Sequence, residues 1–128
     1  KKRTRGIMWP ERETVETELG SFEKNGDGWM CYCDYDARDL EMSVDDRGGK
    51  PDQSQVAFLL SLLPRLPGYE LECRKEIDAV VEHDLAGIFF KDGCECVLAF
   101  NWGDGEWGRT VFAEMTGGKV IGMYIISD

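Results

Sequence analysis

The sequence predicts an α+β fold, with an antiparallel or mixed sheet in βββααββββ order and two central helices packed on one face. Apolar and polar residues alternate with a period of two in the first and last thirds of the 128 residues. The middle third changes to the 3.6-residue period of an amphipathic helix. Because the helices are grouped and do not alternate with strands, a doubly wound parallel sheet is not expected. The pattern leaves open whether the two β segments form one sheet or two packed halves.

The length fits one domain, which we expect to span residues 11–128. Residues 1–10 show no periodicity and include Lys1, Lys2, Arg3 and Arg5. We therefore expect a flexible, basic N-terminal arm. The chain does not begin with Met, so a removed upstream segment remains an open alternative.

The first third predicts a three-strand antiparallel meander separated by turns. A strand at 15–19, continued by Phe22 after a bend, precedes the turn Asn25-Gly26-Asp27-Gly28. The second strand spans 29–35 and the third spans 40–44, with the turn Asp36-Ala37 between them. In the third strand, apolar residues face one side and polar residues the other.

Two helices are expected in the middle third. Pro51 and Asp52 are typical of a helix start, and Val56, Leu59, Leu60 and Leu63 follow the spacing of a buried helix face. Pro64 and Pro67-Gly68 should end this helix. A second helix is expected over 69–83, although 69–73 also fits a strand.

The last third predicts four strands. They are expected at 85–90, 94–100, 110–115 and 120–126, with hairpin turns at Lys91-Asp92-Gly93 and Gly117-Gly118. The last strand is apolar on both faces, which is typical of a covered strand.

The charge favours a basic protein partner. The formal net charge is −10, and residues 11–46 hold twelve Asp or Glu against three basic residues. Such a surface repels nucleic-acid phosphates and anionic membranes, so neither is an expected partner. The alternative is that these acids only solvate the surface. We expect a monomer or a small homo-oligomer.

A cytoplasmic location is expected. No run reaches the roughly 18 apolar residues of a membrane span, and no apolar segment follows the basic start as a secretory signal requires. The five cysteines are an odd number, which argues against a closed disulfide framework. Cys31 and Cys33, and likewise Cys94 and Cys96, form C-x-C pairs inside strand patterns. Buried free thiols are therefore favoured over a zinc site, whose ligands usually lie on turns with wider spacing.

The sequence contains no catalytic or cofactor motif. The single histidine, His83, lies at the end of the second expected helix. Its favourable interaction with the helix dipole there is enough to explain a histidine at this position without a catalytic role. Two groups of acidic loop residues do not match the order of a calcium-binding loop, and no phosphate-binding loop is present. We therefore expect no metal and no cofactor, while a carboxylate pair across a cleft remains open.

The tryptophans mark the most informative candidate site. Trp102 and Trp107 flank an acidic glycine loop that contains Asp104 and Glu106, and Trp29 follows the turn that contains Asp27. Aromatic and acidic side chains at loop edges are typical of surfaces that bind a basic protein. The alternative is that the tryptophans cap the core.

Two segments resemble certain small bacterial domains of unknown function. Glu18-Leu19-Gly20-Ser21-Phe22, the Trp29 strand and Leu40-Glu41-Met42-Ser43-Val44 are similar to the opening of those domains. The segment from Phe100 to Val111 is similar to their acidic hairpin, although Arg109 stands where they often carry His. Some of those domains occur beside polymorphic toxins as suspected immunity proteins. The resemblance implies no catalytic residues to carry over to this chain.

Two functional hypotheses follow from the sequence. The first is a non-enzymatic, acidic protein-binding domain, of which an immunity-like protein that neutralises a basic partner is one case. The second is a small enzyme or ligand-binding protein whose cleft combines carboxylates, tryptophans and His83.

Overall fold

The computed structural model describes residues 13–76, 83–93, 95–102, 109–116 and 119–127. Nine strands and one helical run make up this part of the chain. The N-terminal strands are β1 (Thr14–Thr17), β2 (Gly20–Asn25), β3 (Gly28–Tyr35), β4 (Arg38–Arg47) and β5 (Lys50–Pro51). The helical run consists of α2 (Gln53–Leu62), η1 (Leu63–Arg65) and α3 (Leu66–Glu76). The C-terminal strands are β6 (His83–Asp92), β7 (Glu95–Trp102), β8 (Arg109–Thr116) and β9 (Lys119–Ser127).

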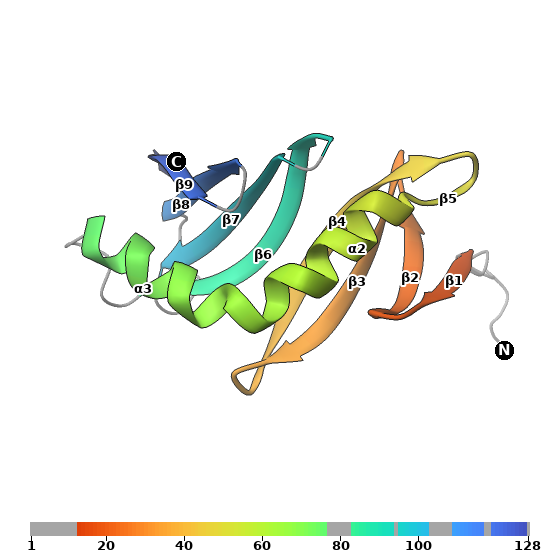
Figure 1. The fold of residues 1–128 in the computed structure, drawn as a ribbon, viewed down its shortest axis with the longest axis horizontal. Coiled ribbons are helices and arrows are strands. Elements are labelled where there is room, and N and C mark those ends of the chain that lie inside the picture. The colour runs from red at the N-terminus through yellow and green to blue at the C-terminus, as the bar shows by residue number, and fades with distance from the viewer. Residues whose placement is uncertain (1–12, 77–82, 94, 103–108, 117–118, 128) are drawn as a thin grey trace, which may run out of the picture.

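The strands form one mixed sheet in the order β1-β2-β3-β4-β6-β7-β8-β9, with β5 paired to β4. This confirms the α+β class and answers the open question of one sheet or two. Two antiparallel meanders, β1–β4 and β6–β9, meet at the single parallel pairing of β4 with β6. That pairing joins only Glu41 with Gly87 and Met42 with Ile88. Figure 1 shows the two meanders side by side behind the helical run.

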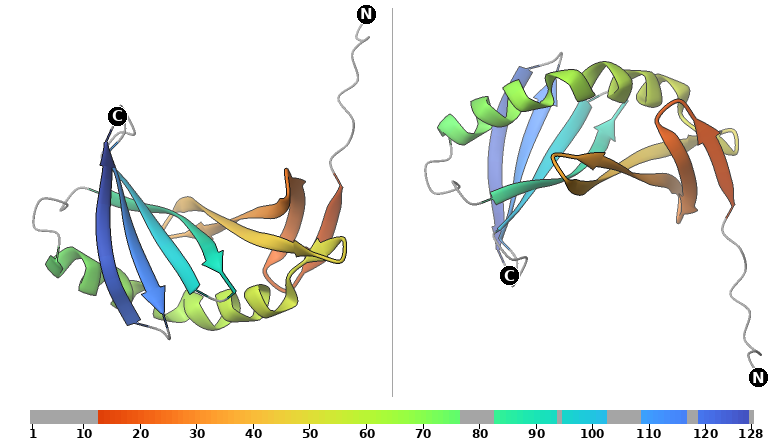
Figure 2. Two further views of the ribbon diagram at one scale, coloured as in Figure 1. Left: turned by 90° about the horizontal axis from the view of Figure 1, so that it is seen from above. Right: turned by 90° about the horizontal axis from the view of Figure 1, so that it is seen from below.

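The prediction of two helices is wrong, because the helical run is continuous. The prolines do not interrupt it: Pro64 lies in the first turn of η1 and Pro67 in the first turn of α3. Proline is best tolerated in the first turn of a helical segment, where its fixed φ angle fits the helix. Leu63 and Leu66 at the two joints keep right-handed helical angles. The run lies along one face of the sheet, as the two views of Figure 2 show.

The prediction also differs from the structure at three further places, two in the order βββααββββ and one in an element boundary. The expected first strand is two strands, because the chain turns at Glu18 and Leu19 and β1 pairs with β2. The short strand β5 was not expected. His83 is the first residue of β6 and pairs with Trp102, so it does not end a helix. The expected N-terminal arm and the turn at 117–118 lie outside the described residues.

The core lies between the sheet and the helical run. Alternate residues of β2, β3 and β4 are buried, among them Phe22, Trp29 and Met42. Leu59 and Leu66 of the helical run join the same cluster, as do residues of β6, β7 and β8. Asp52 begins α2, as predicted, because its side chain accepts a hydrogen bond of 3.1 Å from the Gln55 N–H.

Candidate functional site

The surface of the β1–β4 meander that faces away from the helical run is acidic. Because Phe22, Trp29, Leu40 and Met42 point into the core, the alternate positions on these strands point outward. Outward positions from Thr14 to Asp45 hold no Lys or Arg. The acidic face is defined here as the outward-facing Glu16, Glu23, Tyr32, Asp34, Asp39 and Glu41.

Tyr32 lies at the centre of the acidic face and is 57% exposed. It pairs with Glu41 across β3 and β4, and its hydroxyl donates a 3.3 Å hydrogen bond to Glu41 Oε1. The Glu41 carboxylate, more than any other group, raises the pKa of Tyr32; partial burial, Asp39 and Glu23 raise it further. The phenol is therefore neutral at pH 7 and surrounded by negative charge.

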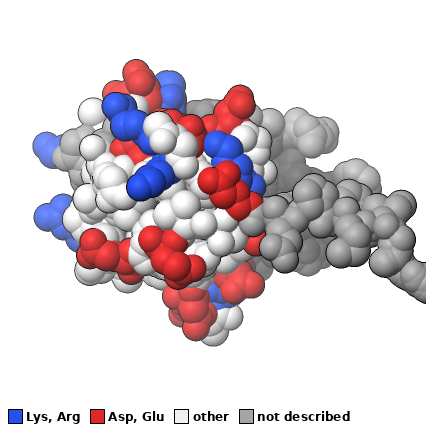
Figure 3. All heavy atoms as spheres, turned by 90° about the vertical axis from the view of Figure 1, so that its right-hand side faces the viewer, with Lys and Arg blue, Asp and Glu red and all other residues white. Residues whose placement is uncertain are grey.

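Acidic and basic side chains are mixed on another side of the molecule. Figure 3 looks at the molecule from the β1–β5 end, where basic side chains stand among the acidic ones. Lys24, for example, lies 3.2 Å from Asp46 and 5.0 Å from the Trp29 ring. A partner approaching the outward side of β1–β4 would instead meet carboxylates and a phenol.

A groove borders the acidic face at the junction of the two meanders, and we call it the seam groove. Its volume is about 220 Å³. Its lining includes Glu41 and Ser43 from β4, Gly87 and Phe89 from β6, and Ala99 and Asn101 from β7. The two meanders therefore share one hollow on the side of the sheet that the helical run leaves uncovered.

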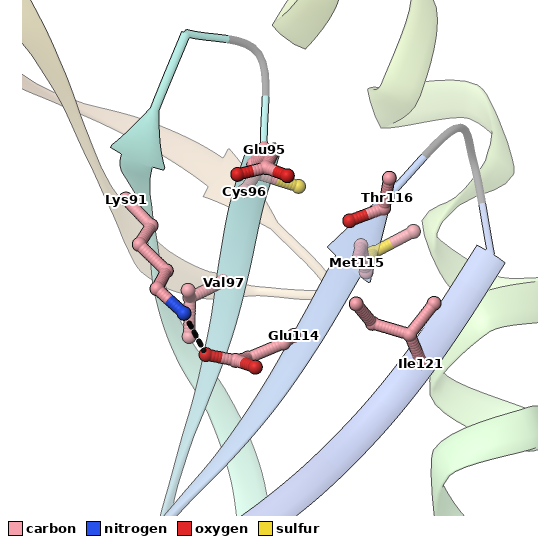
Figure 4. A pocket seen from close by; sticks show the side chains of 8 residues that line it. All are labelled: Lys91, Glu95, Cys96, Val97, Glu114, Met115, Thr116 and Ile121. Carbon is pink, nitrogen blue, oxygen red and sulfur yellow. Dashed lines mark hydrogen bonds and ion pairs between the residues drawn. The ribbon is translucent and has the colours of Figure 1, made fainter.

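Two other hollows occur among the described residues. One, of about 270 Å³, lies at the start of α2 between Arg47, Lys50 and Ser54. The other, of about 30 Å³, lies between β7, β8 and β9 and has room for about one water. Figure 4 shows Lys91 and Glu114 beside it, joined by a 2.9 Å ion pair. All three hollows fall below the roughly 300–1,000 Å³ of sites that enclose small molecules.

Most of the site that the tryptophans predicted lies outside the described residues. Asp104, Glu106 and Trp107 lie outside the described residues, and only the backbone of Trp102, at the end of β7, is described. Asp27 is exposed in the turn between β2 and β3. A binding role for Trp102, Asp104, Glu106, Trp107 and Asp27 therefore stays a prediction.

Trp29 is not available as a binding anchor, which corrects its assignment to the site. It is 1% exposed and packs in the core, and its Nε1 donates a 2.7 Å hydrogen bond to Asp46 Oδ1. The alternative that the sequence left open, a core tryptophan, describes this residue. Its place on the inward side of β3 follows from the same alternation that turns Tyr32 outward.

The described cysteines are free and face the core. Cys31, Cys73 and Cys96 are buried and Cys33 is half-buried. Burial, more than any other cause, raises the pKa of Cys31 to about 12 and that of Cys73 to about 11. These two thiols are therefore protonated at neutral pH, which makes them poor nucleophiles. No group of three or more His, Cys, Asp or Glu that could hold a metal occurs within the described part of the chain.

Tyr32 and Glu41 were missed at the sequence level, although a signal for them existed. The alternation in β3 and β4 sets Tyr32 and Glu41 on the polar side, opposite Cys31 and Met42. Only the register, which pairs Tyr32 with Glu41, shows that they meet.

Comparison with protein-family models, with curated proteins and with solved structures found no match to this chain. No described helix has the length and apolar character that crossing a membrane requires. The site therefore has to be interpreted from its own geometry.

Proposed function

We propose that this protein is a non-enzymatic binding protein whose acidic face engages a basic protein partner. The observation that supports the proposal is the acidic face itself, with five carboxylates around a half-exposed tyrosine on the sheet surface that faces away from the helical run. Opposite charge speeds encounter with a basic partner and disfavours wrong partners. A tyrosine at the centre of such a patch supplies contact area and a hydrogen bond.

An interaction surface fits the described geometry better than a small-molecule site does. The three hollows lined by described residues are smaller than a typical small-molecule site, and the described buried thiols with raised pKa are poorly suited to nucleophilic chemistry. The same carboxylates repel phosphate groups, which favours a protein over a nucleic acid. The immunity role implied by the resemblance is one case of this proposal, in which the basic partner is a toxin.

Selection from a random dodecapeptide phage library tests the proposal. Wild-type protein should recover peptides enriched in Lys and Arg. Glu41→Lys should lose that enrichment and weaken binding of a recovered peptide by about tenfold or more, because it places a like charge beside the ligand. Affinity should also fall as salt rises from 50 to 300 mM, since exposed charges are screened.

The matched control is Glu72→Lys, the same charge change at an exposed position of α3 on the opposite layer. It should keep the enrichment. Recovery of peptides without net positive charge by the wild-type protein, or an equal loss in both variants, would reject the acidic face as the binding surface.

A further inference from the structure

The seam groove has a floor of small residues. Gly87 on β6 pairs with Ala99 on β7, and the register shifts between Leu85 and Gly87, so that Ala86 is an extra residue. A β-bulge of this kind is common beside functional sites because it redirects the strand. Gly87 has no side chain and Ala99 has only a methyl group, so both leave room for the hollow that they line.

The two walls of the groove differ in chemistry. On the β4 side lie Glu41, whose carboxylate accepts a hydrogen bond from the Tyr32 hydroxyl of β3, and Ser43. On the β6 side stands Phe89, whose ring packs edge-to-face on Phe112 with centroids 5.8 Å apart. Asn101 closes the β7 side, and no Lys or Arg lines the groove. The site is therefore apolar along its floor and negative at one wall.

This combination matches a long side chain with an apolar stem and a cationic head. Lys and Arg bury their stems against apolar surface while the charge stays at a polar edge. The volume of about 220 Å³ suits one such side chain and is below that of a typical small-molecule site. Glu23 and Asp39, which raise the pKa of Tyr32, add negative charge to the acidic face that borders the groove.

We propose that the seam groove is a specificity pocket for one arginine side chain of the basic partner. The guanidinium would donate to the Glu41 carboxylate and to the Ser43 hydroxyl, and the stem would lie over Gly87 and Ala99. Arginine is favoured over lysine because its planar group can donate to two acceptors in one plane. This inference rests on the proposed function, since it names the side chain of the basic partner that the acidic face would recognise.

NMR titration with Nα-acetyl-L-arginine methylamide tests the pocket directly. Saturable shifts are expected at the amides of Glu41, Gly87 and Ala99. The citrulline analogue has the same shape without the charge, and the norleucine analogue keeps only the stem. Both should produce at most a tenth of the arginine shifts at equal concentration, and equal shifts from citrulline would overturn the proposal.

One variant separates the pocket from the acidic face. Ala99→Leu fills the floor without changing charge, and its matched control is Ala57→Leu at an exposed position of α2. Ala99→Leu should abolish the arginine shifts and Ala57→Leu should retain them. Glu41→Gln keeps the side-chain size and should also lose them, which provides a second test if Ala99→Leu does not fold.

The peptide selection distinguishes failure of the pocket from failure of the proposed function. With Ala99→Leu, recovered peptides should remain basic but lose any preference for Arg over Lys. An unchanged arginine preference, or arginine shifts confined to strands away from the groove, would reject the pocket and keep the acidic surface. If wild-type protein selects no basic peptides, the proposed function and the pocket both fail.

Discussion

Gln55 connects the helical run to both meanders at the residue scale. Its side chain is 1% exposed, and it accepts a 2.7 Å hydrogen bond from the Asp45 N–H of β4. Its Nε2 donates to Asp45 Oδ2 at 2.8 Å and to the Gly93 carbonyl, between β6 and β7, at 2.7 Å. Buried polar groups are tolerated where their hydrogen-bonding capacity is used in this way.

Replacing Gln55 with leucine should therefore destabilise the fold although it adds apolar surface. The Asp45 N–H and the Gly93 carbonyl lose their partner, and the cost should be about 2 kcal/mol of unfolding free energy. Gln53→Leu, at an exposed position of the same helix, is the control and should change stability by less than about 0.5 kcal/mol. Urea unfolding measures both; equal effects would contradict the role of Gln55.

Asp52 should make stability depend on acid pH. Its burial would raise the pKa of the carboxyl, but hydrogen bonds from the Gln55 N–H and from Arg47 outweigh burial, and the net pKa is lowered. A lowered folded-state pKa gives stability that is complete above the ordinary value of about 3.9 and is lost as pH falls through the folded value.

The substitution Asp52→Asn isolates this contribution because asparagine also caps helices well. Wild type should be more stable than the variant at pH 6 by up to about 1 kcal/mol, since Arg47 is mostly exposed, and the difference should shrink toward pH 2.5. Urea midpoints across this range give the result. The pH dependence of the difference should also shrink in an Arg47→Met background.

The sequence predicts which way a site residue points only where the pattern within a single strand determines it. The period of two in β3 was sufficient to separate Tyr32 from Cys31. The meeting of Tyr32 with Glu41, and of Glu41 with Gly87, depends on strand register and on the order of strands in the sheet. Local alternation encodes neither the strand register nor the strand order. The sequence therefore pointed to aromatic residues at loops and not to residues on the face of the sheet.

The β3–β4 hairpin depends on a glycine for close packing at the element scale. Gly28 begins β3, opposite Asp45, and a methyl group there would lie 2.7 Å from the Val44 carbonyl oxygen. That oxygen belongs to the backbone of β4 and cannot move without disturbing the pairing. The glycine of the predicted turn is thus required by the neighbouring strand and not by an unusual φ angle.

Gly28→Ala should lower the unfolding free energy by about 1–3 kcal/mol through this overpacking. The control is Gly122→Ala in β9, where a methyl group would meet nothing within 4 Å and the φ angle is ordinary. That variant should be neutral or up to about 1 kcal/mol more stable, because alanine restricts the unfolded chain and suits a strand better. Thermal or urea unfolding that ranks the two variants in the opposite order would refute the account.

The elements themselves were largely predictable, whereas their boundaries at prolines were not. Alternation identified β3, β4 and β7, and the Asp52 cap identified the start of α2. The sequence predicts helix ends at Pro64 and Pro67 because proline breaks a helix interior. The chain avoids that cost with the short η1 turn, so that each proline falls in the first turn of a new helical segment. The burial of Leu66 and Cys73 in the core beyond the prolines favours the continuous run.

At the scale of the whole molecule, two meanders with little direct pairing are held as one body by side chains and the helical run. β4 and β6 share two register pairs, and Arg38 forms a 2.5 Å ion pair with Asp84 across the same junction. The helical run contacts both meanders: the Tyr35 hydroxyl of β3 donates to Glu70, and Arg74 lies 5.9 Å from the Phe100 ring of β7. One cluster of buried residues includes both meanders and the helical run.

This arrangement predicts that a destabilising substitution in one meander lowers the stability of the other meander equally. Leu98 of β7 is fully buried, and Leu98→Ala should cost about 2–5 kcal/mol. If the molecule opens as a unit, native-state hydrogen exchange should show the same loss of protection for the slowest amides of β3 as for those of β7. The reciprocal variant, Met42→Ala in β4, should lower protection in β7 by as much as in β3. Loss confined to the meander that carries the substitution would show that β1–β4 and β6–β9 open independently, and the seam groove between them would then open and close with that motion.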